Sequence, residues 1–129
     1  MNCIIVDDDA GCVKTLEAII KRYCPQLQIV GTANNIGDTV RLINSVKPQL
    51  VFLDVEIGSE TGFNLFNYFL SPEFYVVFTT AHEKYALKAI KSSCYDFLLK
   101  PVVIQEVVSV VSKLEKEKKG SSSQNVNVL

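Results

Sequence analysis

Three aspartates, Asp7, Asp8 and Asp9, follow one another directly after the apolar run IIV. Neighbouring carboxylates repel and raise one another's pKa, so this arrangement costs free energy unless a positive group lies among them. The residue types therefore predict that a cation binds at this point of the chain.

Polar residues also end three later apolar runs. Asp54 ends LVFLD, Thr80 ends YVVFTT, and Lys100 ends DFLLK just before Pro101. This oxygen-rich set suits Mg²⁺ better than zinc or calcium. An aspartate beside a cation, a lysine and a hydroxyl can accept a phosphoryl group, because the positive groups offset charge on the phosphoryl oxygens during in-line attack.

The elements that must position these residues follow from the hydrophobic pattern. Continuous apolar runs, typical of strands covered on both faces, predict parallel strands at 2–6, 28–33, 50–54, 75–80 and 96–100. Apolar residues of helical period lie between and after them, and Asp9 is the expected N-cap of the first helix. The order (βα)5 predicts an α/β fold with a doubly wound, five-stranded parallel sheet. Such sheets bind ligands outside the carboxyl ends of their strands, where the polar residues gather.

Composition narrows the class of protein. The chain has 129 residues, a net charge of -1 and 48% hydrophobic residues, as expected for one domain without a nucleic-acid or membrane charge signature. No leader and no apolar run of about 18 residues is present in the sequence. Four dispersed cysteines are expected to be core thiols in a reducing compartment, so we predict a cytoplasmic protein. We expect a domain at 1–118, and a linker or the truncated start of an output region at 119–129.

Four motifs, IIVDDD, VFLDVEIGSETG, FTTA and FLLKP, resemble the receiver (REC) domain of bacterial two-component response regulators over Met1 to about Lys118. The stretch TTAHEKYALKA is similar to receivers coupled to LytTR-type DNA-binding domains. The resemblance implies a flavodoxin-like receiver fold. It also implies a phosphorylatable signalling switch, which assists its own phosphorylation and dephosphorylation but is not an enzyme with a free substrate.

Residue roles follow from the resemblance. Asp54 would accept the phosphoryl group of a sensor histidine kinase, and Mg²⁺ would be held directly by Asp8, through water by Asp7, by Asp54 and by the main-chain carbonyl of Glu56. Thr80 and Lys100 would contact the phosphoryl group, and Phe97 would be the aromatic switch residue that follows Thr80. The bond between Lys100 and Pro101 would be cis.

The resemblance also implies the output of the switch. Phosphorylation would change the surface formed by residues 85–90, 96–100 and 104–114, through which the family dimerises or docks partners. We expect a phosphorylation-dependent homodimer that regulates transcription, contacts no membrane, and reaches DNA only through an output domain absent from this chain.

Two alternatives stay open, and one loop departs from the family pattern. The chain could be a receiver-like interaction module that works without phosphate. A magnesium-dependent aspartyl-phosphate phosphatase is less favoured, because its D-x-D motif would lie on the first strand. The loop from Val55 to Gly62 lacks the usual Met-Pro and is expected to be less rigid or differently folded. His82 is not favoured as a catalytic base, and Glu56 is hypothesised to repel or misplace the attacking water, lengthening the phosphoryl lifetime.

Overall fold

The computed structural model describes residues 1–92 and 94–128, with side chains described as far as Glu117. Its main sheet has five parallel strands in the order β2-β1-β3-β6-β7. These are β1 (Asn2–Val6), β2 (Gln28–Ala33), β3 (Leu50–Asp54), β6 (Tyr75–Thr80) and β7 (Asp96–Leu99). The predicted strands and the α/β doubly wound class are confirmed, with the last strand ending one residue earlier than expected.

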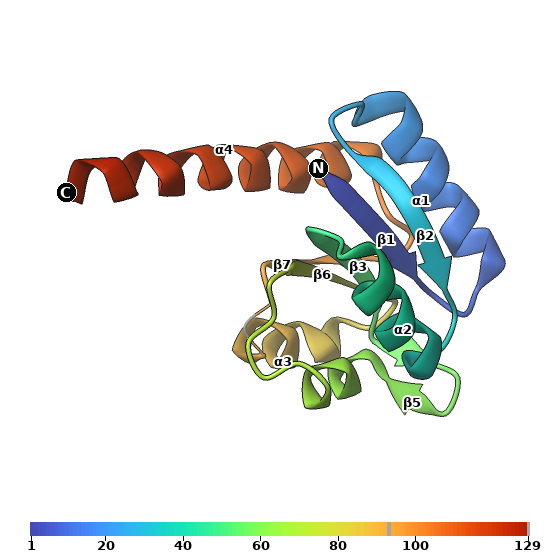
Figure 1. Cartoon of the computed structure of the whole chain (residues 1–129). Helices are drawn as coiled ribbons and strands as arrows, with labels where there is room; N and C mark the ends of the chain where they lie inside the picture. The colour runs from blue at the N-terminus through green and yellow to red at the C-terminus, as the bar shows by residue number, and fades with distance from the viewer. Residues whose placement is uncertain (93, 129) are drawn as a thin grey trace.

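Helices cover both faces of this sheet, as Figure 1 shows. One face carries α1 (Ala10–Tyr23) and α4 (Ile104–Val128), and the other carries α2 (Ile36–Val46) and α3 (Ala86–Lys91). Each face has its own buried apolar cluster, because neighbouring residues of a strand point to opposite sides. Phe52, for example, belongs to the cluster under α1 and α4, while its neighbour Leu53 belongs to the other.

The side chain of Asp9 caps the start of α1 at the edge of the sheet. The side chain of Asp9 accepts hydrogen bonds from the backbone N–H groups of Gly11 and Cys12, at 2.8 and 3.2 Å. Two otherwise unpaired N–H groups of the first turn are thereby satisfied. The predicted N-cap role of Asp9 is confirmed, which leaves Asp7 and Asp8 just outside the helix.

The segment between β3 and β6 differs most from the expectation. Its aromatic residues were expected to form an α-helix, but it contains the short 3-10 helix η1 (Gly62–Asn67). Phe63 and Phe66 pack on Phe78 of β6, with ring centroids 4.7 and 6.1 Å apart. These aromatic contacts decide the local geometry in place of a regular helical stripe. The next predicted helix is divided into η2 (Glu83–Tyr85) and α3.

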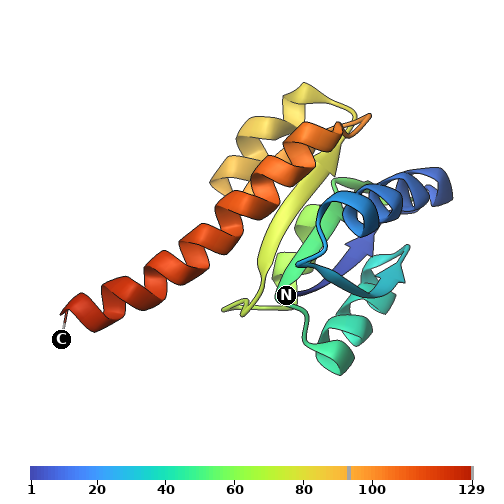
Figure 2. The ribbon, with the colours of Figure 1, turned by 90° about the horizontal axis from the view of Figure 1, so that it is seen from above.

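The last helix extends beyond the sheet. Figures 1 and 2 show α4 running on past the ends of the strands toward the C-terminus. Its packed part carries Val107, Val111 and Leu114 against the core. The backbone stays helical to Val128, through the segment 119–128 that was expected to be a linker. The division of the chain at residue 118 remains a prediction.

All four cysteines are free thiols, and the prediction that they lie in the core is confirmed for two of them. Cys3 and Cys24 are buried, and Cys12 and Cys94 are partly buried. Burial raises the pKa of the Cys3 thiol to about 12. No helix of the described residues is both long and apolar enough to cross a membrane.

Candidate phosphoryl and metal site

The predicted site residues meet at the carboxyl ends of the strands. Asp7 and Asp8 follow β1, Asp54 ends β3, Thr80 ends β6 and Lys100 follows β7. The strand order reverses between β1 and β3, because β2 lies on the outer side of β1. Open parallel sheets bind ligands at this reversal.

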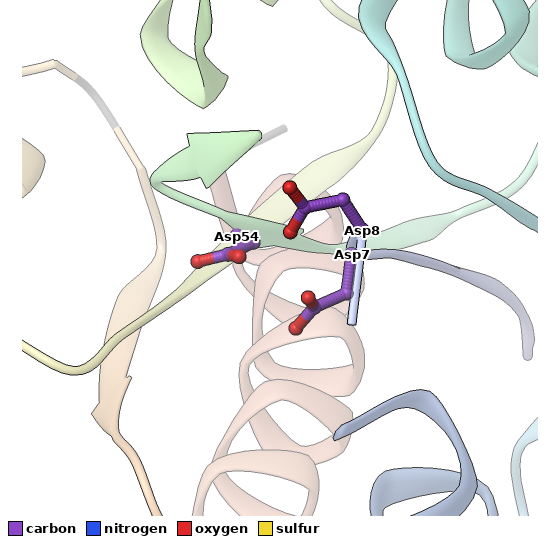
Figure 3. A group of neighbouring side chains, drawn as sticks. All are labelled: Asp7, Asp8 and Asp54. Carbon is purple, nitrogen blue, oxygen red and sulfur yellow. The ribbon is translucent and has the colours of Figure 1, made fainter. Parts of the chain in front are cut away.

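Three carboxylates form the centre of the site. Figure 3 shows Asp7 and Asp8, from the end of β1, beside Asp54 of β3. One carboxylate oxygen from each lies within 4.8 Å of the others. Asp7 and Asp54 are each only 5% exposed, whereas Asp8 is exposed. The sequence prediction that these three residues share one place is confirmed.

Lys100 provides the positive charge that contacts this cluster. Its Nζ lies 2.8 Å from Asp7 Oδ2 and 3.2 Å from Asp54 Oδ2. Burial by itself would lower the pKa of Lys100, but the hydrogen bond to Asp7 and the charge of Asp54 outweigh it and hold that pKa above its ordinary value. Lys100 therefore stays an ammonium. The bond from Lys100 to Pro101 is cis, as predicted.

The single positive charge of Lys100 does not neutralise the three carboxylates of the cluster. Burial, followed by the charge of Asp7, raises the pKa of Asp54 from 3.8 to about 6, although Lys100 and the backbone N–H of Glu56 act in the opposite direction. A carboxyl group whose pKa lies well above its ordinary value is in surroundings with too much negative charge or too little water. The oxygen donors of this cluster fit a hard divalent cation such as Mg²⁺.

Backbone groups hold the acidic side chains in place. The N–H of Asp9 donates to Asp7 Oδ1 at 2.9 Å, and the N–H of Gly58 donates to Asp8 Oδ2 at 2.7 Å. Glu56, whose main-chain carbonyl is predicted to be a metal ligand, lies two residues after Asp54 in the chain. Its role remains a prediction.

Thr80 and Phe97 occupy the predicted side of the site. Thr80 is 1% exposed, and its hydroxyl accepts from the N–H of His82 at 3.1 Å and lies 3.4 Å from the carbonyl oxygen of His82. Phe97 is partly buried on β7, opposite Phe78. The switch role of Thr80 and Phe97 is not decided by this geometry.

The loop after Asp54 forms a structure that sequence reasoning did not find. It forms a two-stranded antiparallel hairpin of β4 (Glu56–Ile57) and β5 (Glu60–Thr61). Gly58 at its turn has a φ of 60°, and a Cβ on Gly62 would lie 2.3 Å from the carbonyl oxygen of Asp54. The spacing of the two glycines in EIGSETG was the available signal, because glycine is favoured where φ is positive or backbones approach closely.

Comparison with known proteins agrees with this geometry. Residues 3–112 match the family model described as the response regulator receiver domain. The sensory transduction protein LytT of Enterococcus faecalis is 33% identical to this chain, and the match covers 91% of this chain and 49% of LytT. The transcriptional regulatory protein BtsR of Escherichia coli is 29% identical, and the match covers 100% of this chain and 53% of BtsR. The response regulatory domain of mrkE from Klebsiella pneumoniae superposes with a TM-score of 0.82 at 26% identity, covering 93% of this chain and 99% of that domain.

Proposed function

The chain belongs to the response regulator receiver domain family of two-component systems, and on this basis we propose that it is a phosphoacceptor switch that takes a phosphoryl group from a histidine kinase onto Asp54. One observation carries the proposal: Asp54 is buried beside two further carboxylates and an ammonium, at the reversal point of the sheet. The match to LytT agrees with the predicted LytTR-associated type.

Each side chain has a role in the proposed reaction. The carboxylate of Asp54 attacks the phosphorus of the donor, and Lys100 offsets negative charge on the phosphoryl oxygens from its position 3.2 Å from Asp54 Oδ2. The hydroxyl of Thr80 donates a hydrogen bond to a phosphoryl oxygen. Asp7, Asp8, Asp54 and the carbonyl of Glu56 would hold Mg²⁺, whose chemistry is to neutralise charge as the phosphoryl group is transferred.

The proposed output surface lies around α3, β7 and the start of α4. Four large apolar side chains there are at least 40% exposed: Leu87, Ile90, Val103 and Ile104. Exposed apolar groups of this kind are typical of association surfaces. Phosphorylation of Asp54 would change this surface through Thr80 and Phe97, and so favour a homodimer.

The chain spans about half the length of the curated relatives cited above. We therefore propose that transcriptional control is exerted by an output region joined after α4. The receiver domain itself would not contact DNA.

Intact mass after incubation with acetyl phosphate and Mg²⁺ tests the proposal. We expect one phosphoryl adduct of about 80 Da that requires Mg²⁺ and is lost in Asp54→Asn. If no adduct forms on the folded protein and beryllofluoride with Mg²⁺ also fails to bind, the chain is a receiver-like module that works without phosphate. Sustained turnover of a phosphomonoester would support the phosphatase alternative instead.

A further inference from the structure

A cavity lies beside the phosphoryl site, between the start of α1 and the loop that joins β7 to α4. Its volume is about 340 Å³, and small-molecule pockets span about 300 to 1,000 Å³. Three of its lining residues, Ile5, Leu16 and Phe52, belong to the buried cluster under α1 and α4. Asp7 and Lys100 line it as well. The cavity therefore borders the acidic cluster and extends from there into the apolar layer on one face of the sheet.

Much of the cavity wall is apolar. Ile5, Leu16 and Phe52 are buried, and Val102 adds an aliphatic side chain from the loop after β7. A charged molecule would lose its hydration against these side chains without compensation. Water is also held poorly there, because a buried water needs about two to four polar partners. The wall therefore favours a molecule with an apolar body.

One buried hydroxyl group lines this cavity without a partner. Thr79 is 4% exposed. Val77, two residues earlier on β6, packs under α1 and α4, so the side chain of Thr79 points to the same face of the sheet. Among the residues that the structure describes, none forms a hydrogen bond with the Thr79 hydroxyl. Buried hydroxyls are normally hydrogen-bonded, so this position requires a polar atom within the cavity.

The two carboxylates at the border of the cavity are already engaged. Asp7 accepts from the ammonium of Lys100 and from the N–H of Asp9. Asp9 accepts from two N–H groups in the first turn of α1. Their charges disfavour an anionic ligand, and their engaged oxygens leave little for an ammonium ligand to bind. The molecule that fits is therefore uncharged.

Donors, in contrast, remain available on the polar side of the cavity. Lys100 has three N–H groups, and its Nζ contacts Asp7 and Asp54 at 2.8 and 3.2 Å. The same ammonium interacts with the thiol of Cys12, a weak acceptor that also lines the cavity. A carbonyl oxygen is a stronger acceptor than a thiol. One such oxygen would accept from Lys100 and from the hydroxyl of Thr79.

We propose that this cavity binds a small uncharged molecule with an apolar body and one carbonyl oxygen, which accepts hydrogen bonds from Thr79 and Lys100. Because Lys100 also contacts Asp54, the molecule and a phosphoryl group compete for the same ammonium. Occupation of the cavity should therefore slow phosphorylation. By linkage, beryllofluoride bound at Asp54 should weaken binding in the cavity. The binding site is independent of the proposed function, whereas this coupling rests on it.

Methyl NMR of the whole chain, with acetophenone as the probe, tests the site. We expect acetophenone to shift the methyl signals of Ile5, Leu16 and Val102 and not those of Ile36, which packs on the opposite face. Benzoate is the matched probe, since it has the same ring with a charged carboxylate, and it should bind at least about tenfold more weakly. Absence of shifts would mean that the cavity holds water only. That result, or equal affinity for the two probes, would overturn the site.

Two variants and a control test the residues that form the site. Thr79→Val removes the hydroxyl and keeps the shape, so affinity for acetophenone should fall about fivefold, the factor of one hydrogen bond of ordinary net strength. Thr32→Val makes the same change at an exposed strand position outside the cavity and should leave the affinity unchanged. Val102→Phe places a ring in the cavity and should abolish the shifts, which keeps the test decisive if Thr79→Val fails to fold. Equal affinity in wild type and folded Thr79→Val would overturn the proposal.

Intact mass measures the coupling to the phosphoryl site. With acetyl phosphate and Mg²⁺, saturating acetophenone should slow formation of the adduct about fivefold in the wild type and leave Val102→Phe unaffected. An unchanged rate in a wild type that shows the methyl shifts would overturn the coupling. A wild type that forms no adduct without acetophenone would overturn the proposed function and the coupling together, and the methyl shifts would still decide the binding site.

Discussion

The strands and their carboxyl ends are both buried, but burial has opposite consequences in the two places. Phe52 in the middle of β3 is 1% exposed and packs in an apolar cluster. Asp54, two residues later, is 5% exposed, and burial raises its pKa to about 6. Removing apolar surface from water stabilises the fold, whereas removing a carboxylate from water opposes its ionisation. The same strand therefore stabilises the domain along its length and carries a destabilising reactive group at its end.

The largest change in stability is expected from a substitution in the apolar cluster that contains Phe52. Phe52→Ala should lower the free energy of unfolding by about 3 to 5 kcal/mol, because it removes buried apolar surface and leaves a cavity. Urea unfolding measures the change. Leu70→Ala is the control, since Leu70 is 99% exposed and its loss should change stability by less than about 0.5 kcal/mol. Equal effects of the two substitutions would contradict the assignment of the core.

A substitution that removes the charge of Asp54 should change the free energy of unfolding in the opposite direction. Without metal at pH 7.5, Asp54→Asn should raise the free energy of unfolding by about 2 to 3 kcal/mol, because it removes a charge that burial and Asp7 disfavour. The pKa of Asp54 is higher in the folded chain than its ordinary 3.8, so wild-type stability falls as pH rises from there through about 6. The gain in the variant should therefore vanish near pH 3.8. A gain independent of pH would exclude the ionisation of Asp54 as its source.

Adding the cation should relieve the same repulsion. Mg²⁺ at ten times its Kd should stabilise the wild type by about 1.4 kcal/mol, through binding to the folded state alone. Thermal unfolding with EDTA or Mg²⁺ measures this change. The increase should be smaller in Asp54→Asn, which lacks one of the three carboxylates. An identical increase in both proteins would place the ion away from Asp54.

The smallest effect is expected at the hairpin turn. Gly58→Ala should cost about 1 kcal/mol, because the φ of 60° at Gly58 is unfavourable for a residue with a Cβ. The N–H of Gly58 donates to Asp8, so Mg²⁺ affinity should fall as well. Ser59→Ala, at the neighbouring exposed position, should leave both quantities unchanged. A Gly58→Ala protein with full stability would show that the turn adapts without strain.

Much of the fold and the centre of the site could be predicted from the sequence, because the strands are continuous apolar runs and the polar residues stand where those runs end. Asp7, Asp54 and Lys100 are far apart along the chain, yet the parallel order of the strands requires their meeting at one edge. The capping role of Asp9 follows from residue type alone.

The loops could not be predicted in the same way. The hairpin after Asp54 depends on backbone contact at Gly62, and η1 depends on how Phe63 and Phe66 reach Phe78. The pairing of Glu56 with His82 depends on two loops that are 26 positions apart in the chain and have no shared periodicity. Such contacts are set by tertiary packing, which single-residue preferences do not contain.

Calorimetric titration of Mg²⁺ into the wild type and into Asp54→Asn tests most directly whether the acceptor and the ion share one pocket. We expect one ion per wild-type chain and release of about half a proton per ion near pH 6, because Asp54 is about half protonated there without the ion. Asp54→Asn should bind Mg²⁺ more weakly and release no proton. Equal affinity and equal proton release in the two proteins would contradict the shared pocket.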